Sequence, residues 1–337
     1  MKTVLSRRLF DSAKHNGAKV LLLLTTIIWG SSFFILKNTL DEIPVFFLLS
    51  FRFLFSALLL AVICWKKWKL FNLGYLFKGG VTGIFLAFAY IFQTLGLQHT
   101  TPGTNAFLTT VYCILVPFMG WAVTKRRPGI LNIVAAAVCV TGIGLVCMDG
   151  SGGGFSFEGE GYTLICGLFF ALHIVAVGEF GKKPDTMLYT VVQFATAFLV
   201  CMIFFFATGE SFPSSFSTES VLSLVYVTVL ATCVCFVMMN VGIKYASPVS
   251  ASLILSLEAV FGVAFSMIFY RERLTLQVGL GFLIIFAAIV LSEVVPEVLR
   301  AGRWRAFASV NAEGRKEVYI RSDGRGEPQE DADGAPL

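Results

Sequence analysis

Apolar residues fill long runs along this chain, and short polar loops separate the runs. Each run is close to the roughly 20 residues that a helix needs to cross the hydrocarbon core of a bilayer. The pattern therefore predicts ten membrane-spanning helices. Their expected limits are 18–36, 44–64, 77–97, 103–123, 129–148, 161–179, 187–207, 220–241, 248–270 and 276–295.

Composition supports a polytopic membrane protein. Hydrophobic residues make up 56% of the chain and charged residues only 14%, against about 25% charged in soluble domains. The eight cysteines fall inside apolar runs without the spacing of metal ligands, so we expect small buried side chains. We expect no metal, no cofactor and no nucleic-acid partner; the expected surroundings are the lipid bilayer.

An internal repeat divides the chain into two halves. Gly242–Arg273 has an earlier copy 146 positions upstream, Gly96–Arg127, and Pro248 then corresponds to Pro102. Five spans per half is an odd number, so the halves enter the membrane from opposite sides. We predict an all-α integral membrane fold of two inverted five-helix repeats. The expected divisions are an N-terminal arm at 1–17, repeats at 18–148 and 161–295, an external glycine-rich loop at 149–160, and a polar, disordered tail at 296–337.

The distribution of Lys and Arg predicts the orientation. If the N-terminus is inside, nearly all basic loops are inside, and the outer loops hold only Lys37, Arg271 and Arg273. Cytoplasmic loops are enriched in Lys and Arg, so both termini are expected in the cytoplasm. The first apolar run lacks a convincing cleavage site, and we interpret it as a retained helix.

Polar residues inside the spans are candidates for a substrate site, because polar groups in lipid are costly. Asn105, Thr109 and Tyr112 share one helical face, and the repeat places Glu258 on the corresponding face of the ninth span. If a pseudo-two-fold axis relates the two repeats, both faces meet in one cavity. The full expected set is Trp29, Ser32, Phe33, Tyr90, Gln93, Asn105, Thr109, Tyr112, His173 and Glu258.

Each candidate has a structural alternative. Ser and Thr in membrane helices usually pack or bond back to their own helix. Trp29 and Tyr90 can equally be packing residues, and His173 among phenylalanines can be an internally bonded histidine. These alternatives stay open at this point.

Arg52 and Glu258 are the most costly groups to bury. Their expected depths differ by roughly 6 Å at about 1.5 Å rise per residue, which is within reach of an arginine. One interpretation is an ion pair that fixes the bundle. The other is that Arg52 binds a carboxylate while Glu258 binds a proton or a cationic group, since a carboxyl group in a dry cavity holds a proton more readily than one in water.

The chain resembles the drug/metabolite transporter superfamily, in its ten-helix EamA-type branch, over about residues 18–295. In the first half the matching residues are Trp29-Gly30 with Phe33, Arg52, and Leu95-Gly-Leu97 followed by Thr101-Pro102. In the second half they are Val241-Gly-Ile243, Ala246-Ser-Pro248, Leu257-Glu258-Ala-Val260-Phe261 and Arg271-Glu272-Arg273-Leu274. The chain departs from the family at Lys125-Arg126-Arg127, where Glu-Arg is frequent, and at Ala259, where Pro is frequent.

The resemblance implies two EamA repeats in a bacterial or archaeal inner membrane and movement of a small metabolite. We expect a secondary transporter, not an enzyme, that exports an amino acid or a drug-like compound by alternating access, with protons as a candidate coupling ion. The alternatives are a carrier of sugar nucleotides or phosphorylated sugars and an integral-membrane enzyme on a lipid-linked substrate. The expected assembly is a monomer or weak homodimer.

Overall fold

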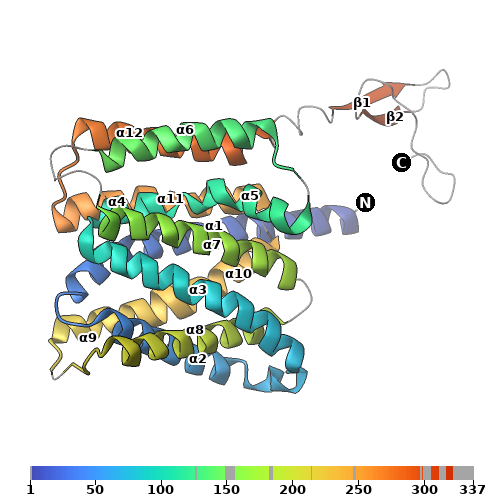
Figure 1. Ribbon diagram of the computed structural model, residues 1–337. Helices are drawn as coiled ribbons and strands as arrows, with labels where there is room; N and C mark the ends of the chain where they lie inside the picture. Colours follow the sequence, from blue (N-terminus) through green and yellow to red (C-terminus); the bar gives the residue numbers. More distant parts are fainter. Residues whose placement is uncertain are drawn as a thin grey trace.

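The computed structural model is a bundle of ten membrane-spanning segments (Figure 1). It describes residues 2–125, 127–148, 156–181, 185–213, 215–245, 248–296, 298, 305–310 and 316–321. Eight of the helices in this part are long and apolar enough to cross a membrane, and Ile254–Tyr270 and Leu276–Ser292 are shorter apolar helices. The ten-helix prediction is confirmed.

The first half contains five segments. They are α1 (Lys2–Thr39), α2 (Val45–Ile63), α3 (Leu73–His99), the broken helix α4 (Pro102–Thr109) with α5 (Tyr112–Thr124), and α6 (Ile130–Cys147). A 3-10 turn, η1 (Trp65–Leu70), joins α2 to α3.

The second half repeats this plan. Its segments are η2 (Phe157–Gly161) with α7 (Tyr162–Phe180), α8 (Thr186–Thr208), α9 (Thr218–Val225) with η3 (Tyr226–Val234) and α10 (Cys235–Tyr245), α11 (Pro248–Phe265) with η4 (Ser266–Tyr270), and α12 (Leu276–Glu293). The segments η2, η3 and η4 have π-helical hydrogen bonding.

Side-chain caps mark where several helices begin. Asn72 accepts from Gly74 N, Ser217 from Ser220 N, and Thr275 from Val278 N. Thr101 accepts from Thr104 N, and Pro102 follows it at the first helical position. These residues satisfy N–H groups that lack a partner within the helix, which explains why apolar runs become helices at these points.

The main contacts between helices occur in pairs that are related by exchange of the two halves. The segments α2 and α8 pack on each other, and so do α6 and α12. The contact of α3 with α7 corresponds to that of α10 with α1, and the contact of α1 with α11 corresponds to that of α7 with α4 and α5. Exchanging the halves therefore reproduces these main contacts.

Glycines show the same relation at close range. A Cβ at Gly96 would meet Thr163 of α7, while one at the equivalent Gly242 would meet Leu22 of α1. Where α6 crosses α12, a Cβ at Gly142 would lie 2.9 Å from the Gly281 carbonyl oxygen, and one at Gly281 would lie 2.9 Å from that of Gly142. The helices can approach this closely only because neither residue has a side chain.

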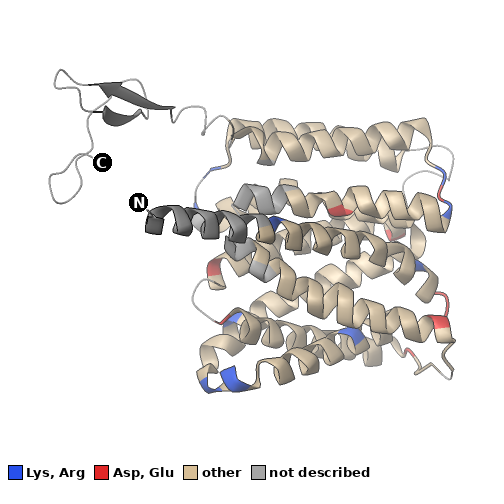
Figure 2. Cartoon of the chain, turned by 180° about the vertical axis from the view of Figure 1, so that it is seen from behind, with Lys and Arg blue, Asp and Glu red and all other residues tan. Residues whose placement is uncertain are grey.

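Charged residues lie mainly at the two ends of the bundle (Figure 2). We call the end with the α1–α2 connection the outer end, following the predicted orientation. There Glu42 accepts hydrogen bonds from Ser217 Oγ and Ser220 Oγ, which lower the pKa of the Glu42 carboxyl. At the inner end Lys67 pairs with Asp185 at 2.8 Å, and Asp185 caps α8.

Both ends of the chain contain more regular structure than the sequence predicts. The helix α1 begins at Lys2, within the segment expected to be an arm. In the polar tail, β1 (Arg305–Val310) and β2 (Lys316–Arg321) form an antiparallel pair. Their alternation is too short and too polar to be recognised from composition.

The glycine contact between α6 and α12 gives a matched test. Gly281→Ala is expected to destabilise the protein by about 1–3 kcal/mol, because the added methyl group must displace the facing backbone. Gly279→Ala, two positions earlier, meets nothing within 4 Å and should leave stability unchanged or slightly raised. Thermal unfolding of the detergent-solubilised protein measures both, and equal melting temperatures would contradict the packing described here.

Candidate functional site

A buried arginine lies at the centre of the candidate site. Arg52 on α2 is 2% exposed, and its Nε donates a short hydrogen bond to Thr232 Oγ1 of η3. Its Nη2 donates to Tyr90 OH at 3.4 Å, and its Cζ lies 4.3 Å from the centroid of the Tyr90 ring. The remaining nitrogen, Nη1, is buried without a hydrogen-bond partner among the described residues. The guanidinium is therefore held in place but incompletely satisfied, which is costly in a buried site.

The π-helical segment η3 supplies part of this arrangement. Thr232 Oγ1 donates to Val227 O at 2.8 Å within the segment, and its oxygen accepts from Arg52. Side chains of two other helices bond to carbonyls of η3, namely Trp29 Nε1 to Ala231 O at 2.7 Å and Ser56 Oγ to Thr228 O at 3.0 Å. Irregular helical turns of this kind occur frequently at functional sites.

A chain of aromatic rings crosses the bundle beside Arg52. Neighbouring ring centroids lie 5.1–6.0 Å apart. In order, the rings are Phe170, Tyr90, Phe53, Phe194, Phe236 and Trp29. Phe53 and Phe194 occupy the same position in α2 and α8, and Tyr90 and Phe236 are 146 positions apart like Gly96 and Gly242. The positions of the six rings are therefore related by the same two-fold exchange of the halves.

The polar residues break this symmetry. Arg52 and Gln193 are both the eighth residue of their helices. Gln193 Oε1 contacts His173 Nε2 at 2.9 Å, so the second half has an amide where the first half has the guanidinium. Tyr90 corresponds to Phe236, and Glu258 to Tyr112. The apolar frame is two-fold, whereas the charges are not.

Glu258 lies near Arg52 without forming an ion pair. The ion pairs of the described residues are Lys67–Asp185 and His99–Glu158, and no hydrogen bond to the Glu258 carboxylate occurs in this part of the chain. Glu258 is 8% exposed. Titratable groups on four helices lie within electrostatic range of it, namely Arg52, Tyr90, Cys166 and Cys235. The two side chains thus share the centre of the bundle without a direct ion pair.

Asn105, Thr109 and Gln93 are bound to one another. Asn105 Nδ2 donates to Gln93 O at 3.2 Å and to Thr163 Oγ1 at 2.7 Å. Gln93 Nε2 donates to Thr109 Oγ1 at 3.4 Å. These bonds join α3, α4 and α7, as the packing alternative expects. Asn105 Oδ1 is buried without a partner among the described residues.

The other predicted residues have individual partners. Ser32 Oγ donates to Trp29 O of its own helix at 2.7 Å, and Phe33 is buried against α11 near Gly262. Tyr112 is joined to Tyr90 through Phe170, with ring centroids 6.1 and 5.4 Å apart. The structure thus groups Arg52, Tyr90, Tyr112 and Glu258 near the centre. His173 and Trp29 have partners on α8 and η3 instead.

Thr232 and Phe170 are parts of this site that the sequence analysis did not select. A signal for Thr232 exists, because it is a polar residue inside the eighth predicted span, where polar groups are costly. Phe170 corresponds to Trp29 in the aromatic chain, and only the two-fold relation distinguishes it from other phenylalanines.

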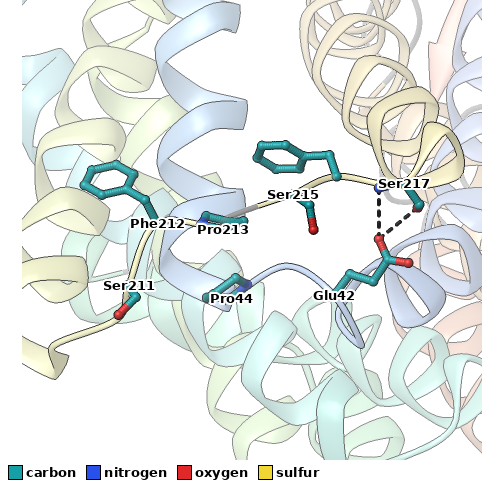
Figure 3. A pocket seen from close by; sticks show the side chains of 8 residues that line it. Glu42, Pro44, Ser211, Phe212, Pro213, Ser215 and Ser217 are labelled. Carbon is teal, nitrogen blue, oxygen red and sulfur yellow. Dashed lines mark hydrogen bonds between the residues drawn. The ribbon is translucent and has the colours of Figure 1, made fainter.

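A separate pocket of about 700 Å³ opens at the outer end, and Figure 3 shows Glu42 in its wall, bonded to Ser217. The other lining residues are Pro44, Ser211, Phe212, Pro213, Ser215 and Phe216. None of the predicted site residues lines it, so it is distinct from the centre around Arg52.

Comparisons with known proteins agree with this architecture. The model of the EamA-like transporter family matches residues 17–148 and 158–293, one match for each half. A solved crystal structure aligns with a TM-score of 0.60 at 14% identity, covering 84% of this chain and 99% of that one. That likeness supports the fold alone.

Curated relatives are similar over most of their length. An uncharacterized transporter of Archaeoglobus fulgidus is 30% identical over 284 residues, which is 84% of this chain and 88% of that protein. A second one from the same organism is 25% identical, covering 82% and 98%. The protein PagO of Salmonella typhimurium is 21% identical, covering 63% and 71%. With both halves matched and the predicted helices in place, this multi-pass membrane protein belongs to the EamA-like transporter family.

Proposed function

We propose that this protein is a secondary active transporter that exports a small organic metabolite, such as an amino acid or a drug-like compound, with protons as the coupling ion. The two related halves provide the two pseudo-symmetric arrangements that alternating access needs. The Lys and Arg distribution supports an inner-membrane orientation with both termini in the cytoplasm.

The unpartnered Nη1 of Arg52 is the observation that carries this proposal. A buried guanidinium with an open nitrogen can bind a carboxylate of a solute, and this binding supplies a hydrogen bond that the described residues do not make. The face of Tyr90 covers the guanidinium, and the rings of Phe53 and Phe170 pack against Tyr90. Such a mixture suits a medium-sized organic solute with one anionic group.

Glu258 is the proposed proton site. Its carboxylate has neither a hydrogen bond nor an ion pair among the described residues, and it is close enough to Arg52 to interact electrostatically. Proton uptake at Glu258 would change the field at Arg52. Binding of the solute and binding of the proton would thus be linked through one small region.

Counterflow in proteoliposomes tests the role of Glu258. We expect the wild type to exchange one class among amino acids and related metabolites, with a rate that differs between two pH values. Glu258→Gln removes the titrating group, so its counterflow should be independent of pH. Glu219→Gln, an exposed acid on α9, is the matched control and should behave like the wild type. Unchanged pH dependence in Glu258→Gln would refute proton binding at this residue.

A charge-conserving substitution tests the role of Arg52. Arg52→Lys keeps the charge but loses the planar fork, so we expect the solute concentration for half-maximal counterflow to rise at least about tenfold. Arg273→Lys, in the α11–α12 connection, is the control. If Arg52→Lys has a normal concentration dependence while remaining folded by size-exclusion chromatography, Arg52 does not bind the solute.

A further inference from the structure

The carboxylate of Glu272 connects the outer ends of the fourth segment, α4–α5, and the ninth segment, α11–η4. Glu272 follows η4 and is half-buried. It accepts hydrogen bonds from Thr101 Oγ1 at 2.5 Å and from Gly103 N at 3.0 Å, and Ser266 Oγ donates a short bond to it. Glu272 thus satisfies the N-terminus of α4 from the end of the ninth segment.

Two features of the local sequence allow this contact. A Cβ at Gly103 would lie 2.6 Å from Glu272 Oε2, so the carboxylate can reach the backbone only because position 103 is glycine. Arg271 has a φ of 58°, a left-handed conformation that ends η4 and turns the chain toward α4. Non-glycine residues seldom adopt this conformation.

Close packing continues inward from Glu272. A Cβ at Gly262 of α11 would lie 2.4 Å from Ala106 Cβ of α4, so these two helices touch directly. The inner half of the fourth segment, α5, packs on α6, α7 and α12 instead. The fourth and ninth segments are therefore joined at the outer end, between the exterior and the centre around Arg52.

The other copy of the repeat has different side chains at the equivalent sequence positions. Lys125 has a φ of 61° at the position equivalent to Arg271, so the turn is repeated. The residues equivalent to Glu272, Gly103 and Ser266 are Arg126, Val249 and Gly120. An arginine cannot accept hydrogen bonds from a helix N-terminus. The acceptor, the glycine and the hydroxyl are thus present in one copy of the repeat and absent from the other.

We infer that Glu272 is the gating residue of the outer end: its bonds to Thr101 and Gly103 hold α4 against α11 and close the route from outside to Arg52. This inference rests on the proposed transport function, which requires a closed and an open state at each end. Because the sequence provides this acceptor in one copy of the repeat and an arginine in the other, the resting protein favours the state that is closed outside. Release of Glu272 from α4 is then a step of the outward opening.

The test combines two measurements on the full chain in membranes, and neither measurement uses a transported solute. Hydrogen–deuterium exchange reports opening of the α4 amides. A membrane-impermeant thiol reagent, added outside right-side-out vesicles, reports access to Cys166, which is fully buried 3.8 Å from Thr109 of α4. Peptide mass spectrometry separates Cys166 from the other cysteines.

Two variants remove the contact in different ways. Glu272→Ala deletes the acceptor, while Gly103→Ala keeps the charge and displaces it with a methyl group. In both we expect α4 exchange and Cys166 labelling to rise at least about tenfold, as loss of charge-assisted bonds predicts. Glu219→Ala, an acid in the first turn of α9, is the control and should change neither.

The outcomes separate the possible roles. Faster α4 exchange without faster Cys166 labelling would reduce Glu272 to a helix cap and overturn the gating role. If neither variant changes α4 exchange or Cys166 labelling, the gating role of Glu272 is also overturned. If both readouts rise but no solute is ever transported, the proposed function fails while the closure by Glu272 stands.

Discussion

Every polar group buried in a bilayer must find its partners inside the protein, and Arg52 is the group for which this requirement is hardest to meet. Its side chain is held by Thr232, and Thr232 is placed by the π-helical segment η3. Trp29 and Ser56 bond to carbonyls of the same segment from α1 and α2. The position of one charge therefore depends on helices from both halves, and one of its nitrogens still has no partner among the described residues.

The two halves share their helix packing but differ in their polar and charged residues. Glycine contacts, helix neighbours and the aromatic chain recur in both halves, because both must fill the same volume with the same helix geometry. The difference between Arg52 and Gln193 alters charge and leaves the packing of α2 against α8 in place. Symmetric packing allows two states of similar energy, and asymmetric charge gives the centre and the two ends different properties.

The sequence predicted the helices well because hydropathy over 20 residues is a strong signal, and the repeat was visible in its prolines and glycines. It did not predict the break at Thr110 and Val111 or the π-helical turns, since these depend on neighbouring helices. The sequence placed Arg52 and Glu258 inside the spans but could not decide between a structural ion pair and a functional pair, and both side chains are buried in the structure. The direct ion pair that was one interpretation is not formed between them. Asn105 and Thr109 were chosen for polarity alone, which does not distinguish a substrate contact from a bond between helices.

The central claim is that the open nitrogen of Arg52 is completed by a carboxylate of the transported solute. The most direct measurement is equilibrium binding of α-amino acids and their amides to the purified protein, compared with Arg52→Lys. The account predicts that the protein binds at least one amino acid about 10- to 100-fold more tightly than its amide, as expected for loss of a charge-assisted hydrogen bond. It also predicts that this preference is lost in Arg52→Lys. Equal affinity for acid and amide, or a preference that survives the substitution, would contradict it.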